Sequence, residues 1–314
     1  MNKGERIFVA GHKGMVGSAL LRALENAGCG NIVTADREVL DLRDQEGVMG
    51  FFKRERPDHV FLAAARVGGI KANSTYPAEF AYDNIMIQTN VIHSAHLCGV
   101  KKLVFMGSSC IYPKDCPQPI REEYLMSGPL EPTNEAYAIA KIAGIRMTAY
   151  YAAQFGLQGI CPVPCNLYGP NDSFDPDNSH VLSALVKRFT DAVAEKKDEV
   201  VLWGTGVAVR EFMHVDDMAR AVLMLADGWR SSEIINVGTG ETISIRELAE
   251  LIADRTGYRG RIEWDPSMPD GMLKKCLDSS RLNDLGFRPE IPIHAGVEDV
   301  IREYRNRGAA GPHD

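Results

Sequence analysis

The sequence has no apolar run of the roughly 18 residues that a membrane-spanning helix needs. Its first residues lead directly into a strand-like segment, 6–10, without the basic and apolar regions of a signal peptide. It also has no excess of basic residues, because 35 Lys and Arg stand against 42 Asp and Glu, for a net charge of −7. We therefore expect a cytoplasmic protein without a nucleic-acid or membrane surface, in which local cations bind any phosphorylated ligand.

The seven cysteines include no Cys-x-x-Cys pair, and their number is odd. This spacing is not typical of a disulfide framework or of a structural zinc site. We expect reduced cysteines, most of them in the core, and no bound metal.

The pattern of elements predicts an α/β fold with a doubly wound parallel sheet and a smaller α/β lobe. Apolar strand-like runs alternate with helix-like segments in the first half of the 314-residue chain, as in Rossmann-like folds. Pro, Asn and Asp become frequent between 162 and 178, where we expect the chain to leave the sheet, and it should return over 211–237. The expected domains are 1–165 plus about 211–240 for a dinucleotide, and about 166–210 plus 241–314 for a substrate.

Three glycines, Gly11, Gly14 and Gly17, follow the first predicted strand and precede a predicted helix over 15–27. In that context glycines allow a tight turn, close approach of backbone N–H groups to a pyrophosphate, and close packing of helix on strand. A turn that needs a positive φ would account for only one of the three. The segment therefore predicts a dinucleotide site.

The cofactor type depends on three charges. Asp36 lies 19 residues after Gly17, where a carboxylate typically binds the adenosine ribose of NAD. Arg37 and Lys13 are cations that would instead bind the 2′-phosphate of NADP. Two cations against one carboxylate favour NADP(H).

A Tyr137-x3-Lys141 pair stands in a predicted helix over 136–146, so the two side chains share one face. A neighbouring ammonium should lower a phenol pKa that starts at about 10. Ser108 ends the predicted strand 102–108, and its hydroxyl could hold a substrate oxygen. The pair alone would more readily be a surface helix with an extended lysine. With Ser108 and the glycine loop it predicts nicotinamide chemistry on a hydroxyl or carbonyl group.

Cys110 and His180 carry the side chains best suited to proton exchange near pH 7, with ordinary pKa values of about 8.5 and 6.5. If the strand continues past Ser108, Cys110 points to the same side as Ser108. Alone, Cys110 would be read as a core thiol and His180 as a polar residue at the start of a helix.

These segments resemble the extended short-chain dehydrogenase/reductase family from about residue 7 to about 305, in its branch that acts on GDP-linked 4-keto-6-deoxy sugars. The segments that carry the resemblance are 10–18, 62–70, 107–113, 131–144, 166–171, 178–181, 210–217 and 235–240. The resemblance implies a GDP-sugar substrate, NADP(H), inversion at C3 and C5, and reduction at C4. It also implies a homodimer formed by the long helices near 80–98 and from 137.

The resemblance also implies roles for single residues. Cys110 and His180 would be the acid and base at C3 and C5, while Tyr137 protonates the C4 oxygen beside Ser108 and Lys141 holds the nicotinamide ribose. The implied cofactor-binding residues are Gly11, His12, Lys13, Gly14, Met15, Val16, Gly17, Asp36, Arg37, Met106, Gly107, Ser108, Lys141, Pro164, Cys165, Asn166, Leu167 and His180. The implied substrate-binding residues are Arg188, Trp203, Arg210, Asp270 and Lys275. Asp36 departs from the usual pattern, in which the strand end lacks an acid.

Two alternatives are considered. A sibling 4,6-dehydratase or 4-epimerase would share Tyr137 and Lys141, but dehydratases of this branch place an Asp-Glu pair after the strand-end Ser or Thr, where this chain has Ser109 and Cys110. A non-catalytic nucleotide-sensing protein on the same fold would commonly lack the Tyr/Lys pair.

Overall fold

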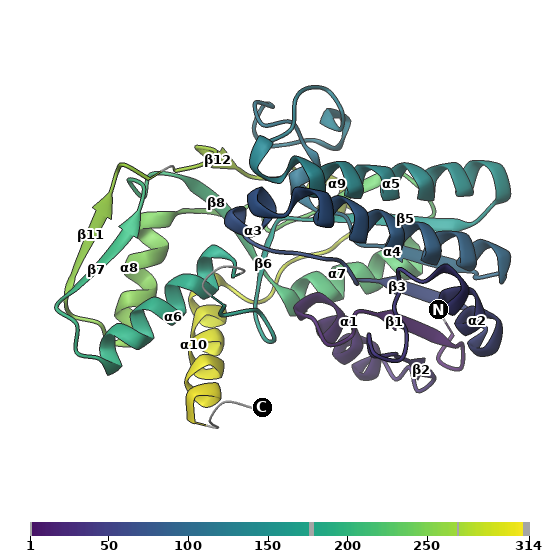
Figure 1. Cartoon of the computed structure of the whole chain (residues 1–314), viewed down its shortest axis with the longest axis horizontal. Coiled ribbons are helices and arrows are strands. Elements are labelled where there is room, and N and C mark those ends of the chain that lie inside the picture. Colours follow the sequence, from purple (N-terminus) through teal and green to yellow (C-terminus); the bar gives the residue numbers. More distant parts are fainter. Residues whose placement is uncertain (1, 176–178, 269, 310–314) are drawn as a thin grey trace.

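The computed structural model describes residues 2–175, 179–268 and 270–309. Its central sheet has six strands, all parallel, and occupies the right-hand part of Figure 1. Their order is β2 (Ile32–Val33), β1 (Ile7–Ala10), β3 (His59–Leu62), β4 (Lys102–Phe105), β5 (Gln158–Pro164) and β9 (Ile234–Val237). This confirms the predicted doubly wound parallel sheet.

The strands β1, β3 and β4 are buried along their whole length, as expected for a sheet with helices on both faces. Strand β1 has β2 on one side and β3 on the other, so successive connections leave it in opposite directions. A reversal of this kind opens a crevice at the carboxyl ends of the strands. The ends of β1 and β3 are therefore where a ligand is expected.

Helices cover both faces of the sheet. On one face α4 packs against both α5 and α2, and on the other α1 packs against α7 (Figure 1). Helix α4 has Pro77 in its first turn, and the chain turns at Gly99 with φ +71° just after its end. These helices are α1 (Met15–Asn26), α2 (Gln45–Glu55), α4 (Pro77–Leu97), α5 (Glu135–Phe155) and α7 (Val215–Gly228), and the short α3 (Ile70–Thr75) precedes α4.

The remaining elements form a lobe with its own apolar cluster, drawn on the left of Figure 1. Its helices pack on one another around Phe189, Leu248 and Val300, which are fully buried. They are α6 (Val181–Ala194), α8 (Ile245–Thr256) and α10 (Ile293–Ala309). Its strands are β6 (Asn166–Tyr168), β7 (Glu199–Trp203), β8 (Val209–His214), β10 (Thr242–Ser244), β11 (Arg261–Asp265) and β12 (Lys274–Lys275).

The expected return to the central sheet over 211–237 is confirmed at its end, where β9 joins the sheet, and wrong at its start from Glu211. Strand β8 pairs with β6, β10 and β12 instead, and the chain returns to the central sheet only with α7 and β9. The backbone of β8 is paired with three other segments, and the fully buried Glu211 also accepts from the N–H groups of Gly240 and Leu277 at 2.8 Å each. The boundaries of the two domains otherwise stay a prediction.

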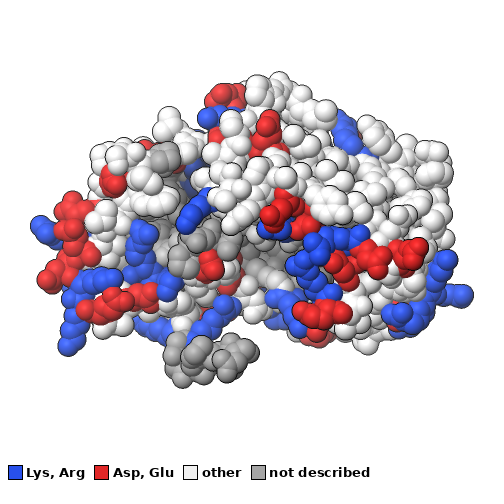
Figure 2. Space-filling model, viewed as in Figure 1, with Lys and Arg blue, Asp and Glu red and all other residues white. Residues whose placement is uncertain are grey.

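Lys and Arg side chains alternate with Asp and Glu over the face drawn in Figure 2, which carries no continuous basic surface. Among the helices of the described residues, none is both long and apolar enough to cross a membrane.

One further short helix, α9 (Ser280–Asp284), lies outside the lobe and packs against β9 of the central sheet.

Candidate active site

The glycine loop joins β1 to α1 by close backbone contacts. Gly11 has φ +84°, and a Cβ there would stand 2.6 Å from the backbone nitrogen of Ala64, after β3. A Cβ on Gly17 would stand 2.0 Å from the carbonyl oxygen of Gly11. Gly14 differs, because its φ is −76° and the nearest atom to an added Cβ is 3.6 Å away. The fold itself thus requires glycine at 11 and 17, whereas space is left open above Gly14.

That space faces the start of α1. Met15 and Val16 form the first turn of the helix, where backbone N–H groups have no partner within a helix and bind anions. The loop geometry therefore suits a pyrophosphate.

The carboxylate of Asp36 is paired with basic side chains of the glycine loop. It lies 2.8 Å from Nζ of Lys13 and 3.3 Å from Nε2 of His12. The hydrogen bond with Lys13 lowers the pKa of Asp36 and raises that of Lys13. The adjacent Arg37 is exposed. The charge of Asp36 is thus offset within the protein.

Ser108 and Cys110 lie in a tight turn after β4. The strand ends at Phe105, and residues Ser109–Ile111 form a 3₁₀ turn, so the strand does not continue to Cys110 as assumed. The turn nevertheless brings the two residues together, because the Ser108 hydroxyl accepts from the Cys110 N–H at 3.5 Å. Burial raises the pKa of the Cys110 thiol, while the ammonium groups of Lys275 and Lys141 favour its thiolate.

Tyr137 and Lys141 project from α5 toward the same turn. The Tyr137 hydroxyl lies close enough to Ser108 for Ser108 to favour its phenolate, and Nζ of Lys141 lies 5.7 Å from the centre of the Tyr137 ring. The expected lowering of the phenol pKa by Lys141 is wrong for this state of the protein. Burial and the neighbouring Cys110 raise the pKa of Tyr137, and burial lowers that of Lys141 to about 8. The Lys141 ammonium instead donates to the carbonyl of Met106 at 2.9 Å.

The other predicted cofactor residues follow the carboxyl ends of neighbouring strands. Gly107 donates its N–H to the carbonyl of Pro162 in β5 at 2.8 Å, and a Cβ there would stand 3.0 Å from that same oxygen. Asn166 donates its side-chain amide to the carbonyl of Glu211 at 2.8 Å. The remaining members are Met106 after β4, Pro164 at the end of β5, Cys165 next to it, and Leu167 in β6.

Two partly buried cations, Arg210 and Lys275, lie next to each other, and the charge of Lys275 acts on Cys110. Arg210 in β8 and Lys275 in β12 are opposite each other in the strand pairing. Burial lowers the pKa of both, and the charge of Arg210 lowers that of Lys275 further. Two cations held close together in this way are suited to bind an anion.

The other predicted substrate residues lie around the end of β7. Arg188 donates to the carbonyl of Val201 at 2.7 Å, and Trp203 is 60% exposed. The carboxylate of Asp270 accepts from the N–H and the hydroxyl of Thr205 at 2.7 and 2.8 Å. Asp270 therefore orders the turn that follows Trp203.

His180 is the residue before α6 and is bound to a partner that sequence reasoning missed. Its Nδ1 lies 3.2 Å from the carboxylate of Asp172, and this hydrogen bond raises the pKa of His180. No contact found among the described residues joins His180 to Cys110. Asn178, from the segment 178–181, lies outside the described residues. Asp172 could have been found from its place directly after segment 166–171.

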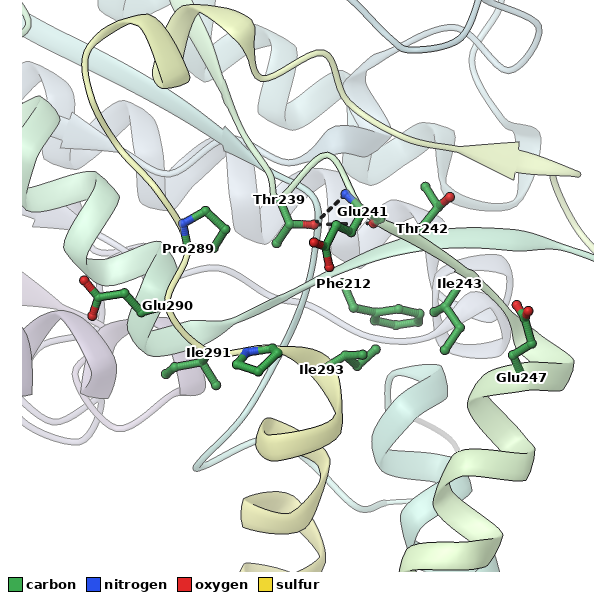
Figure 3. Close-up of a pocket in the computed structure, with 11 residues that line it drawn as sticks. Phe212, Thr239, Glu241, Thr242, Ile243, Glu247, Pro289, Glu290, Ile291 and Ile293 are labelled. Atoms are coloured by element: carbon green, nitrogen blue, oxygen red, sulfur yellow. Dashed lines mark hydrogen bonds between the residues drawn. The ribbon is translucent and has the colours of Figure 1, made fainter.

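A pocket of about 480 Å³ lies away from these residues, between β10, the start of α8 and the segment 289–293 (Figure 3). Its floor is apolar, with Phe212 and Ile243 pointing into it, and none of the predicted site residues lines it. The carboxylate of Glu247 is held by Ser244 in the cap of α8, and that of Glu290 by Arg220. The pocket lacks the proton donors and cations that the Cys110 turn has. No group of residues in the described ranges could hold a metal ion.

Comparisons with known proteins agree with this arrangement. The profile of the NAD dependent epimerase/dehydratase family matches residues 7–238. The chain is 52% identical to GDP-L-fucose synthase of Escherichia coli (strain K12) over 309 residues, 96% of each chain. It is also 52% identical to probable GDP-L-fucose synthase 1 of Oryza sativa subsp. japonica, over 96% of this chain and 93% of the relative.

Among solved structures, a GDP-L-fucose synthetase from Naegleria fowleri bound to NADP superposes with a TM-score of 0.89 at 26% identity, over 98% of this chain and 96% of that one. The family profile covers more than half of this chain, and the two relatives match nearly all of it. The chain therefore belongs to the NAD dependent epimerase/dehydratase family, and its relatives at 52% identity are GDP-L-fucose synthases.

Proposed function

We propose that this protein is an NADP(H)-dependent enzyme that inverts GDP-4-keto-6-deoxy-D-mannose at C3 and C5 and reduces its C4 ketone to give GDP-L-fucose. The observation that carries the proposal is the grouping of Ser108, Cys110, Tyr137 and Lys141 at the carboxyl edge of the sheet. Relatives at 52% identity over nearly the whole chain are GDP-L-fucose synthases.

The inversions need a base and an acid on opposite faces of the sugar ring. The C–H bonds at C3 and C5 are both adjacent to the C4 carbonyl, so removal of either proton gives a stabilised enolate. Cys110 is the base, because its sulfur lies beside Ser108 at the Tyr137 turn; burial raises the pKa of its thiol, and the cations of Lys275 and Lys141 partly offset that rise. His180 is the acid, because Asp172 favours its protonated form.

The reduction uses the other pair of side chains. NADPH supplies the hydride to C4 when it is bound. Tyr137 gives its proton to the C4 oxygen, and its raised pKa keeps the phenol protonated for that role. Ser108, which lies beside Tyr137, holds the same oxygen, and Lys141 holds the nicotinamide ribose.

The two ligands contact the remaining residues. The open space above Gly14 accepts the cofactor pyrophosphate, and Lys13 and Arg37 bind the 2′-phosphate. Arg210 and Lys275 bind the substrate diphosphate, which offsets the repulsion between two partly buried cations. The other substrate-binding residues are Arg188, Trp203 and Asp270.

The chain forms a homodimer through α4 and α5. These helices pack side by side on one face of the sheet and leave large apolar side chains in solvent. The exposed ones are Tyr82, Ile85, Leu97, Ile139, Tyr150 and Phe155. A second copy would bury them in a four-helix bundle. Sedimentation should give twice the 34.6 kDa of one chain, and Ile139→Glu should shift the equilibrium to the monomer.

The substrate is tested by following NADPH oxidation with GDP-4-keto-6-deoxymannose beside the matching UDP- and TDP-sugars. We expect turnover with the GDP-sugar and a product inverted at C3 and C5 by NMR. A reduced product with C3 and C5 unchanged would identify a simple 4-reductase instead. Turnover with only the UDP- or TDP-sugar would contradict the substrate assignment.

A further inference from the structure

Asp172 is a buried carboxylate that faces the exposed His180. Its side chain is 4% exposed, against 45% for that of His180. Three donors converge on it: the Ser173 N–H at 2.8 Å, the Ser183 hydroxyl, and Nδ1 of His180 at 3.2 Å. A charged carboxylate at this depth is compensated by these three bonds.

The turn that carries Asp172 is hydrogen-bonded to two helices, α1 and α10. It spans Gly169 to Asp172, closed by the Asp172 N–H on the Gly169 carbonyl at 3.3 Å. Asn171, in the left-handed region with φ +66°, donates its side-chain amide to Ser18 of α1 at 3.0 Å. Its backbone N–H donates to Glu303 of α10 at 3.1 Å. The position of Asp172 is thus set by the glycine-loop helix and by the lobe together.

We propose that Asp172 is a positioning residue, which holds His180 by Nδ1 and so presents Nε2 as the proton donor to the sugar. This inference rests on the proposed function. A carboxylate only accepts hydrogen bonds, so Nδ1 must carry a proton and the exchangeable proton is the one on Nε2. In each inversion the Cys110 thiolate takes the proton of the broken C–H bond and leaves an enolate. The Nε2 proton forms the new C–H bond on the opposite face, and the nitrogen keeps the electron pair; the thiol then gives up its proton before the next cycle. The exposed imidazole then regains a proton from solvent.

Among the described residues, the charged side chains of the neighbouring helices are paired with other partners. On α10, Glu303 binds Asn171 and Arg307, and Arg307 lies 5.1 Å from the centre of the Phe174 ring. On α6, Lys187 is bound to Asp191 at 2.8 Å. Asp172 is therefore the charge that sets the protonation of His180, which agrees with the upward direction of the His180 pKa.

The test uses Asp172→Asn, which keeps the shape and an acceptor oxygen but removes the charge. Asp191→Asn is the matched control, because it removes a carboxylate from α6, the helix that follows His180, without touching His180. NMR titration of ¹⁵N-histidine-labelled protein, assigned with His180→Asn, reads the protonation of His180 without substrate. Incubation with GDP-4-keto-6-deoxymannose in deuterated water, without NADPH, reads proton exchange at C3 and C5 apart from reduction.

We expect His180 in the wild type to titrate above about 6.5 with its neutral form protonated on Nδ1. Asp172→Asn should lower that pKa and slow exchange at least about tenfold, since a positioned acid is worth about 10²–10⁴ in rate. Asp191→Asn should change neither.

A wild-type His180 that titrates below 6.5, or is protonated on Nε2 when neutral, would overturn the inference even if Asp172→Asn does not fold. So would wild-type exchange rates in folded Asp172→Asn. Absence of exchange in the wild type would overturn the proposed function, and this inference with it.

Discussion

Substitution by alanine should lower the stability of the fold at Gly17 and the affinity for NADPH at Gly14. In Gly17→Ala the new Cβ would stand 2.0 Å from the Gly11 oxygen and 2.6 Å from the Gly11 carbonyl carbon. Both are backbone atoms, so the helix must move away from β1. Overpacking of this kind costs about 1–3 kcal/mol, and a backbone clash belongs at the upper end.

In Gly14→Ala the new Cβ meets nothing closer than 3.6 Å, and φ −76° is ordinary for alanine. Gly14 is the residue that caps α1, where alanine is poorer than glycine by about 0.5 kcal/mol. The stability cost is therefore small. The Cβ would instead fill the space that the pyrophosphate needs, and we expect at least a tenfold weaker NADPH affinity, or about 1.4 kcal/mol.

Urea unfolding without cofactor measures the first effect, and titration of NADPH fluorescence measures the second. The reasoning predicts that Gly14→Ala unfolds close to wild type but binds NADPH poorly, and that Gly17→Ala unfolds at clearly lower urea. Wild-type NADPH affinity in Gly14→Ala would refute the placement of the pyrophosphate. Equal loss of stability in both variants would refute the steric argument.

Three further predictions concern charges. The hydrogen bond with Lys101 is the main cause that lowers the pKa of Glu5 from 4.5 to about 2. The ionised Glu5 therefore stabilises the fold fully above pH 4.5, and this stabilisation is lost as the pH falls toward 2. Because Lys101 is 57% exposed, Glu5→Gln should lower the free energy of unfolding at pH 7 by only about 1 kcal/mol. The variant should also lose less stability than the wild type between pH 4.5 and pH 2, which urea unfolding midpoints measured against pH would show. Lys102 is buried and donates to two carbonyls at the end of α7, so Lys102→Met should cost about 1–3 kcal/mol by the same assay, and an unchanged midpoint would contradict this. Asp36→Ser should increase the preference for NADPH and Arg37→Ala should weaken it, each by about tenfold in kcat/KM; a preference for NADH that Arg37→Ala leaves unchanged would show that Asp36 controls the site.

The sequence predicts the central fold well because each buried parallel strand is a short apolar run between helices. Strand β8 was misassigned because its partners are the distant segments 166–168, 242–244 and 274–275, which no local pattern connects to it. A local sign of a different environment was the polar content of β8 itself, which carries Glu211 beside Arg210 and ends at His214.

The candidate site was partly readable from the sequence. Spacing placed Tyr137 and Lys141 on one helix face, but burial decides their pKa values, and burial depends on the whole fold. Cys110 lies beside Ser108 through a 3₁₀ turn and not through a continued strand. The contact of Asp172 with His180 joins residues eight apart across an irregular loop, and no regular period predicts it. The catalytic and binding roles themselves stay predictions.

The central claim is that inversion and reduction use different side chains in one site, and Tyr137→Phe in deuterated water tests it most directly. The variant is mixed with NADPH and GDP-4-keto-6-deoxymannose, and ¹H NMR follows the C3 and C5 signals while absorbance follows NADPH. The account predicts that both sugar signals are lost at close to the wild-type rate while NADPH oxidation falls by about 10²–10⁴. NADPH oxidation at the wild-type rate, or sugar signals that persist unchanged, would contradict it.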